Sequence, residues 1–119
     1  MSYIRSFLVS WGSVFNLTIG KLVIEGESFS LVPNDAVTGL MLTVGKKAYS
    51  TNSFPIDSII GYENIFMAWM SIILNNGKKI KISVGSKSKK KDLIASLEQQ
   101  RFAIFEAKGE IVPPLSMTI

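Results

Sequence analysis

The sequence predicts a mainly β domain that ends in a helix. Three observations indicate this fold class: short alternating apolar segments divided by turn residues, an Asn-Gly turn between two of them, and helical spacing directly afterwards. A length of 119 residues favours one domain with one modest core. We expect a seven-stranded, bent antiparallel sheet or partly open barrel, whose mouth the C-terminal helix covers.

Seven segments have the pattern expected of strands. The strongest turn signal is Asn75-Asn76-Gly77, because Asn-Gly suits the two positive-φ positions of a type I′ hairpin turn. Gly61 is predicted to mark a β-bulge. The seven predicted strands are residues 21–25, 28–32, 40–44, 47–54, 57–63, 68–75 and 78–84.

Helical spacing occurs towards both ends of the chain. Near the C-terminus it predicts a helix over residues 88–101, with Ser86 or Ser88 as N-cap. Residues 102–107 suit either a continuation of this helix or an edge strand. Near the N-terminus the spacing predicts an amphipathic helix over residues 3–16. The predicted division is therefore an N-terminal helical segment, a β domain and a C-terminal extension, at residues 1–19, 20–102 and 103–119.

Composition excludes several classes of function. The chain has no cysteine and no histidine, so it lacks the commonest general base and the commonest metal ligands. It has no Gly-x-Ser-x-Gly and no phosphate-cradling Gly-rich motif, and Asp35, Asp57 and Glu63 are scattered with no spacing that brings two of them together. We therefore expect a non-catalytic protein without cofactor or metal. No apolar run is long enough to span a bilayer, and no signal peptide stands out, so the expected location is cytoplasmic.

Basic residues are concentrated in one segment. Eight of the thirteen lie between Lys78 and Arg101, against two acidic residues, so that segment carries +6 and the remainder −2. Two interpretations stay open: a solvated helix start, or a site for anionic lipid head groups at the membrane periphery. Nucleic acid is disfavoured, because residues 76–101 contain no aromatic side chain for stacking. The candidate anion-binding residues are Lys79, Lys81, Lys87, Lys89, Lys90 and Lys91.

Apolar surface predicts the leading function, a protein-interaction or self-assembly module, and lipid docking is the alternative. Apolar residues make up 47% of the chain and the mean hydropathy is +0.31, which favours an interface with a protein partner or with a second copy. The alternatives are a helix packed on its own sheet and an interfacial membrane helix, although the latter usually carries more than one basic residue. The exposed face of residues 67–74 is another candidate. The candidate interface residues of the predicted N-terminal helix are Ile4, Phe7, Leu8, Trp11 and Phe15.

Two segments resemble a known family. FPIDSIIGYENI (54–65) and MAWMSIILNNGKKIKISVGSKSKKKDLIASLEQQ (67–100) are similar to the corresponding parts of bacterial pleckstrin-homology-like and GRAM-like domains. The resemblance covers residues 20–100. It implies a seven-stranded bent sheet with a capping helix, and binding of lipids, peptides or protein surfaces, often with self-assembly. The hairpin KLVIEGESFSL departs from the phosphoinositide-binding members, because Glu25 and Glu27 replace their basic motif.

Overall fold

The computed structural model describes residues 4–13, 16–33 and 52–116. Within this part the chain forms seven strands and one long helix. A 3₁₀ turn at Ile56–Ser58 precedes β5. The elements are β1 (Ile4–Ser13), β2 (Asn16–Glu25), β3 (Ser28–Pro33), β4 (Asn52–Pro55), β5 (Ile59–Phe66), β6 (Trp69–Leu74), β7 (Lys79–Ser83) and α2 (Lys87–Ala107).

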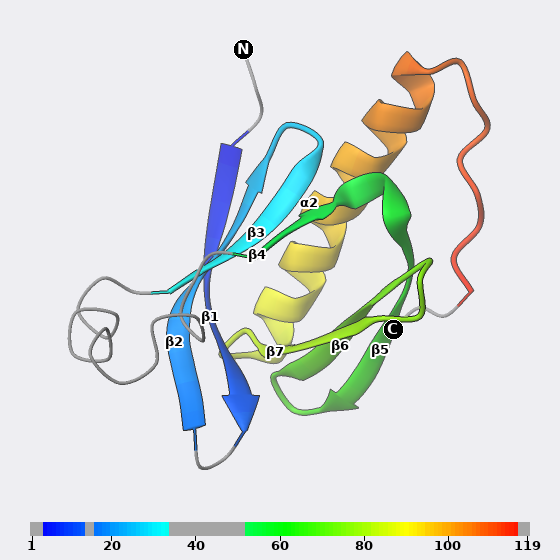
Figure 1. Ribbon diagram of the computed structural model, residues 1–119. Helices are drawn as coiled ribbons and strands as arrows, with labels where there is room; N and C mark the ends of the chain where they lie inside the picture. Colours follow the sequence, from blue (N-terminus) through cyan, green and yellow to red (C-terminus); the bar gives the residue numbers. More distant parts are fainter. Residues whose placement is uncertain (1–3, 14–15, 34–51, 117–119) are drawn as a thin grey trace.

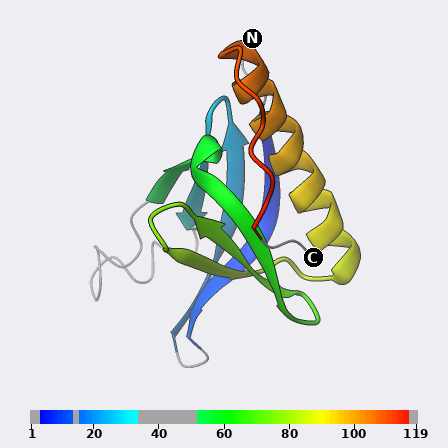
Figure 2. The ribbon, with the colours of Figure 1, turned by 90° about the vertical axis from the view of Figure 1, so that its right-hand side faces the viewer.

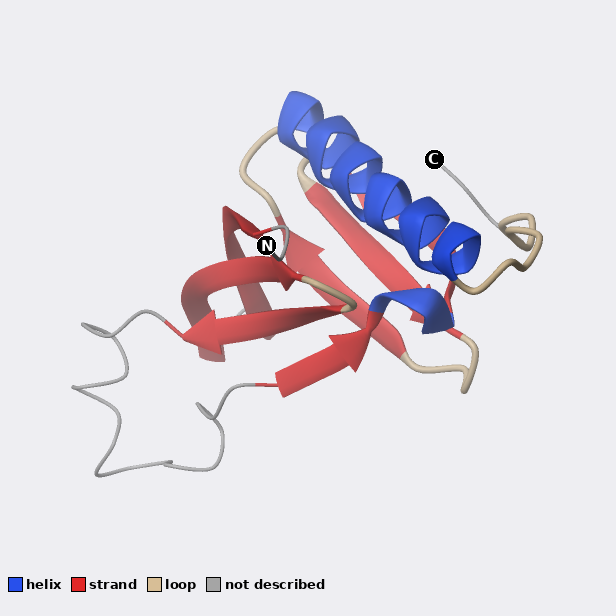
Figure 3. Ribbon diagram, turned by 90° about the horizontal axis from the view of Figure 1, so that it is seen from above, coloured by secondary structure: helices blue, strands red, loops and turns tan. Residues whose placement is uncertain are grey.

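The described strands form one antiparallel sheet in the order β4-β3-β2-β1-β7-β6-β5. The first strand of the chain therefore lies at the centre, and β4 and β5 lie at the two edges. The sheet is bent and not closed, and α2 lies across one side of it (Figures 1, 2 and 3). This arrangement confirms the predicted mainly β fold with a C-terminal helix.

The predicted N-terminal helix is wrong, because Ile4–Ser13 is a strand. β1 pairs with β2 along its whole length, from Ile4 opposite Glu25 to Ser13 opposite Asn16. Phe7 belongs to both possible patterns: it has apolar neighbours at helical spacing, and it alternates with Val9. Pairing with β2 decides between them, since alternation places both of these side chains in the core.

The hairpins and the bulge follow the predictions with one difference. The predicted hairpin 21–25/28–32 is confirmed, although β2 begins earlier, and a register shift in β5 confirms the bulge at Gly61. The turn after β6 also lies where expected. Among its residues only Gly77 has a positive φ (88°), and its N–H donates to the Leu74 carbonyl at 2.9 Å. The turn is therefore not type I′. Residues 40–44 and 47–51 lie outside the described part.

The core lies between the sheet and α2. Ser86 caps the helix as predicted, and residues 102–107 continue it. Leu93 and Leu97 are fully buried against the strands, and Ile94 packs at the margin of the core. Full burial of one such side chain stabilises the fold by about 1.5–3 kcal/mol. The apolar stripe of α2 therefore holds the helix on the bent sheet.

A buried polar network joins β5, α2 and the C-terminal segment. The Tyr62 hydroxyl donates to one Glu98 oxygen at 2.7 Å, and Arg101 donates to the other at 3.0 Å. Arg101 is only 2% exposed, and its second terminal nitrogen donates to the Pro113 carbonyl. The chain after α2 then returns beside β5, where the Ser116 N–H donates to the Ile60 carbonyl at 2.7 Å (Figure 1). The last described residues thus complete the interior.

Tyr62→Phe tests this network through its pH dependence. Burial, followed by the hydrogen bond to Glu98, raises the pKa of Tyr62 above its ordinary 10.0. The unfolded chain therefore releases a proton near pH 10 that the folded chain keeps, and stability falls above that pH by about 1.4 kcal/mol per pH unit. Below pH 10 the wild type should be more stable than Tyr62→Phe by about 1 kcal/mol. Urea unfolding should show this difference shrinking above pH 10, and a constant difference would contradict the assignment.

Candidate functional site

One end of the molecule brings the start of α2 beside the turn between β5 and β6 (Figures 1 and 2). Gly85, with a φ of 91°, turns the chain out of the line of β7. Ser86 Oγ then accepts a hydrogen bond from the Lys89 N–H at 3.2 Å and starts the helix. The Val84 N–H donates to the Ala68 carbonyl at 3.0 Å, which ties the β5–β6 turn to this point.

The six candidate lysines fall into three places. Lys89 lines a pocket of about 570 Å³ between α2 and β1. Lys79 and Lys81 lie on the face of β7 opposite the core, where Lys79 pairs with Glu63 at 3.4 Å and Lys81 lies 5.5 Å from the Trp69 ring. The remaining three line a second pocket, of about 490 Å³, together with residues of β5 and of the β5–β6 turn. The residues of this second pocket are Asn64, Met67, Lys87, Lys90, Lys91, Ile94 and Ala95.

Lys90 is the most constrained of these lysines. Its side chain is only 4% exposed, and its ammonium donates to the Asn64 Oδ1. Loss of hydration, followed by the nearby charge of Lys87, lowers the pKa of Lys90 below 10.5. The first turn of α2 contains no acidic residue, so these cations lie at the positive end of the helix dipole. The pocket is therefore suited to an anion.

The end of β5 and the β5–β6 turn expose apolar side chains, and Met67 among them lines the pocket with the lysines. Phe66 is 60% exposed, Met67 is 65% exposed, and Ile65 is also exposed. Met67 has a φ of 49°, and it is the one described residue other than glycine with a positive φ. Sequence patterns placed Met67 in a candidate interface, the exposed face of residues 67–74, and predicted no turn here. The signal that could have located this turn is the length of the apolar run around β6. A run longer than the six residues of this strand must continue outside it, in a turn or in the next strand.

The five candidate interface residues also lie in different environments. Phe7 lies in the core and Trp11 packs against it, whereas Ile4 and Leu8 are exposed. Phe15 lies outside the described residues. Because β1 is a strand, its exposed side chains lie beside those of β2. We define the outer face as Leu8, Leu17 and Ile19, which border a shallow depression of about 280 Å³.

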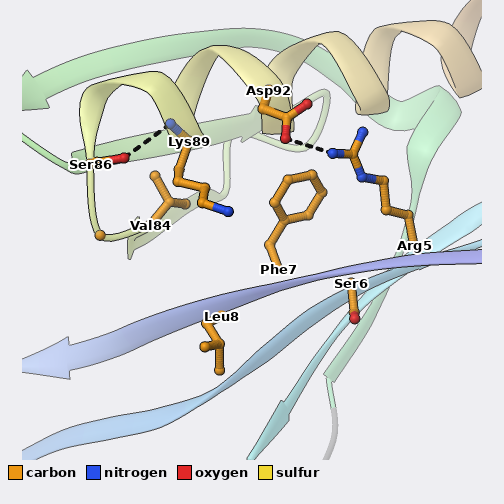
Figure 4. Close-up of a pocket in the computed structure, with 9 residues that line it drawn as sticks. Arg5, Ser6, Phe7, Leu8, Val84, Ser86, Lys89 and Asp92 are labelled. Atoms are coloured by element: carbon orange, nitrogen blue, oxygen red, sulfur yellow. Dashed lines mark hydrogen bonds and ion pairs between the residues drawn. The ribbon is translucent and has the colours of Figure 1, made fainter.

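The pocket around Lys89 is a groove between β1 and α2 (Figure 4). Arg5 crosses it: one terminal nitrogen is 2.6 Å from Asp92, and the other is 2.7 Å from Ser96 Oγ. The Phe7 ring lies below Arg5, with the guanidinium 4.7 Å from the ring centre. We define the β1 groove as Arg5, Ser6, Phe7, Leu8, Val84, Gly85, Ser86, Lys89 and Asp92.

Comparison with known proteins supports the fold. No protein-family model and no curated protein sequence matches the chain. Among solved structures, the chain is similar to the C-terminal domain of an unknown protein from Leishmania infantum, with a TM-score of 0.57 and 14% sequence identity. The match covers 83% of this chain and 84% of that chain. Within the described residues, no helix has both the length and the hydrophobicity needed to span a bilayer.

Met67→Gly should stabilise the protein. A residue with a side chain costs about 1–2 kcal/mol in the left-handed conformation, and glycine does not incur this cost. We expect the free energy of unfolding to rise by about 1 kcal/mol in Met67→Gly. Met67→Ala is the matched control, because it shortens the side chain but keeps the strain. Equal stability of the two variants in urea unfolding would argue against strain at this turn.

Proposed function

We propose that this chain is a non-catalytic binding module with a pleckstrin-homology-like fold that docks on anionic lipid surfaces. The bent seven-stranded sheet and the helix across it support the fold assignment, since the family resemblance implies both. The docking site is the basic apex, which we define as Ile65, Phe66, Met67, Lys87, Lys90 and Lys91.

The observation that carries this proposal is one pocket lined by Lys87, Lys90, Lys91 and the exposed Met67, next to the exposed Ile65 and Phe66 at the end of β5. A membrane surface offers hydrocarbon and phosphate within a few ångströms, so it can satisfy both. Each lysine near an anionic membrane contributes about 1 kcal/mol. Phe66 adds about 1.5–3 kcal/mol if it is fully buried among acyl chains. The Lys90 ammonium has lost much of its hydration in the free protein, and a lipid phosphate supplies a counter-charge that stabilises it.

The distribution of charge supports the same orientation. The end of α2 and the turn between β2 and β3 lie at the opposite end of the molecule from the basic apex (Figure 1). There the hydrogen bond to Asp57 raises the pKa of Lys108, and the charges of Glu110 and Glu27 act in the same direction. An anionic surface attracts the basic apex and repels these acids, so the molecule arrives with the apex first.

Lys87→Ser with Lys91→Ser should weaken binding to vesicles that contain phosphatidylserine. Removing two contributions of about 1 kcal/mol lowers partitioning by about 30-fold at low salt. The control is Lys79→Ser with Lys81→Ser, which removes the same charge from another surface and should lower binding much less. Sedimentation with vesicles measures both. An equal loss in the two variants would mean that only net charge matters, and no loss would exclude the site.

Phe66→Ser with Met67→Ser should weaken the same binding in a way that salt does not change. Burial of apolar side chains is insensitive to ionic strength, whereas attraction between exposed charges is screened within about 8 Å at physiological salt. We therefore expect a loss of binding that is as large at physiological salt as at low salt. The control is Ile111→Ser, which removes an exposed apolar side chain from the C-terminal segment. Unchanged binding of the double variant would restrict the site to the lysines.

Self-association through the outer face is the second candidate function. Leu8 and Ile19 expose neighbouring apolar side chains on β1 and β2, with Leu17 beside them. A flat apolar surface of this kind suits the same surface of a second copy. Sedimentation velocity should show a species heavier than the monomer that is lost in Leu8→Ser with Ile19→Ser. A monomeric wild type at high concentration would exclude this function, and a dimer that persists in the variant would move the interface elsewhere.

A further inference from the structure

The edge of β1 that faces α2 is open over part of its length. β1 pairs with β7 through only two residues, Ser10 opposite Ser83 and Trp11 opposite Ile82. In the same register, the next pairs that would exchange backbone hydrogen bonds are Leu8 with Gly85 and Ser6 with Lys87. They do not form in the described chain, because Gly85 turns it away into α2. The β1 groove lies where β7 would have continued (Figure 4).

The backbone groups of Ser6 and Leu8 point into this groove. The β2–β3 hairpin closes at Glu25 opposite Ser28 with two residues between them, and such a closing pair exchanges both of its backbone hydrogen bonds. Alternation along β2 then directs Ile24 and Leu22 to β1, where Arg5 and Phe7 receive them. Ser6 and Leu8 therefore direct their N–H and carbonyl groups away from β2, towards the groove.

The side chains of the groove add selectivity to this edge. Phe7 and Val84 give it an apolar floor. The charge of Asp92 is compensated by Arg5 at 2.6 Å, whereas Lys89 takes part in no ion pair within the described residues. Lys89 extends towards the Phe7 ring from the helix side (Figure 4). The groove therefore combines backbone donors and acceptors, an apolar surface and one free positive charge.

We infer that the β1 groove binds an extended acidic segment of a partner protein as an additional antiparallel strand beside β1. The segment takes the path that β7 leaves at Gly85 and forms backbone hydrogen bonds with Ser6 and Leu8. One of its carboxylates pairs with Lys89, which lines the groove. The site is separate from the basic apex, because Lys89 lines the groove whereas Lys87, Lys90 and Lys91 line the other pocket.

Charge favours this occupant over a second copy of the chain. Pairing two β1 edges would bring Lys89 of each copy, unpaired within the described residues, towards that of the other, and like charges opposed in this way are destabilising. The backbone groups at the groove are supplied by a strand edge, and an extended peptide matches their spacing of about 6.6 Å between alternate residues. A lipid head group would leave most of these groups without partners.

The test begins with the full chain and a display library of random twelve-residue peptides. Enriched peptides are synthesised, and their affinities are measured by fluorescence anisotropy. We expect enriched peptides to share an acidic residue within a β-prone segment. Ser6→Pro removes the N–H that faces the groove and should weaken binding about tenfold, whereas Ser6→Ala should leave it unchanged. Lys89→Glu should weaken binding by at least about tenfold, and Lys87→Glu should change it little.

Two outcomes overturn the inference. One is that no peptide is enriched, and the other is that the enriched peptides bind Ser6→Pro and Lys89→Glu as tightly as the wild type. Equal losses in Lys87→Glu and Lys89→Glu would place the peptides on the basic apex instead. If Ser6→Pro does not fold, Lys89→Glu decides, together with amide hydrogen exchange at Ser6 and Leu8, which bound peptide should slow. Slowing by phosphatidylserine vesicles in place of peptide would assign the groove to lipid.

Discussion

The structure depends on the burial of one helix face against a sheet that has no second sheet behind it. Leu93 and Leu97 are fully buried and lie one turn apart, so α2 must lie along the bend of the sheet. Its start then falls beside the β5–β6 turn (Figure 1), and a later turn of the helix reaches the β2–β3 turn, where Gln100 donates to the Gly26 carbonyl at 2.8 Å. The positions of the lysines, of the acidic end and of the β1 groove all follow from this single contact.

The fold was predictable where local signals and packing agree. Ser86, the Leu93 and Leu97 stripe and the Asn-Gly turn marked their elements correctly. Ile4–Ser13 was mistaken for a helix because its aromatic and aliphatic residues satisfy both periods, and only long-range pairing with β2 separates them. The predicted number of seven strands agrees with the described sheet, but its members differ, because β1 replaces a segment outside the described residues.

The candidate sites were less predictable than the fold. Lys89, Lys90 and Lys91 are adjacent in sequence, but successive residues of a helix point about 100° apart, so they serve different pockets. Phe7 and Leu8 are likewise neighbours that point to opposite faces of a strand. The β5–β6 turn has Met67 at its left-handed position, where glycine or asparagine is usual. No turn residue therefore marks it in the sequence. Sequence patterns thus identified the charges and named residues 67–74 as a candidate interface, but they missed the exposed Ile65 and Phe66 at the end of β5.

The C-terminal segment has a consequence for where this domain ends. Arg101 lies in the interior, and its last acceptor is the Pro113 carbonyl, beyond the helix. The Ser116 N–H donates to the Ile60 carbonyl on β5, which is an edge strand of the described sheet with unpaired backbone groups. A shortened protein that stops at Lys108 therefore leaves the buried Arg101 without its Pro113 acceptor and uncovers the Ile60 carbonyl on an edge strand, so we expect it to aggregate.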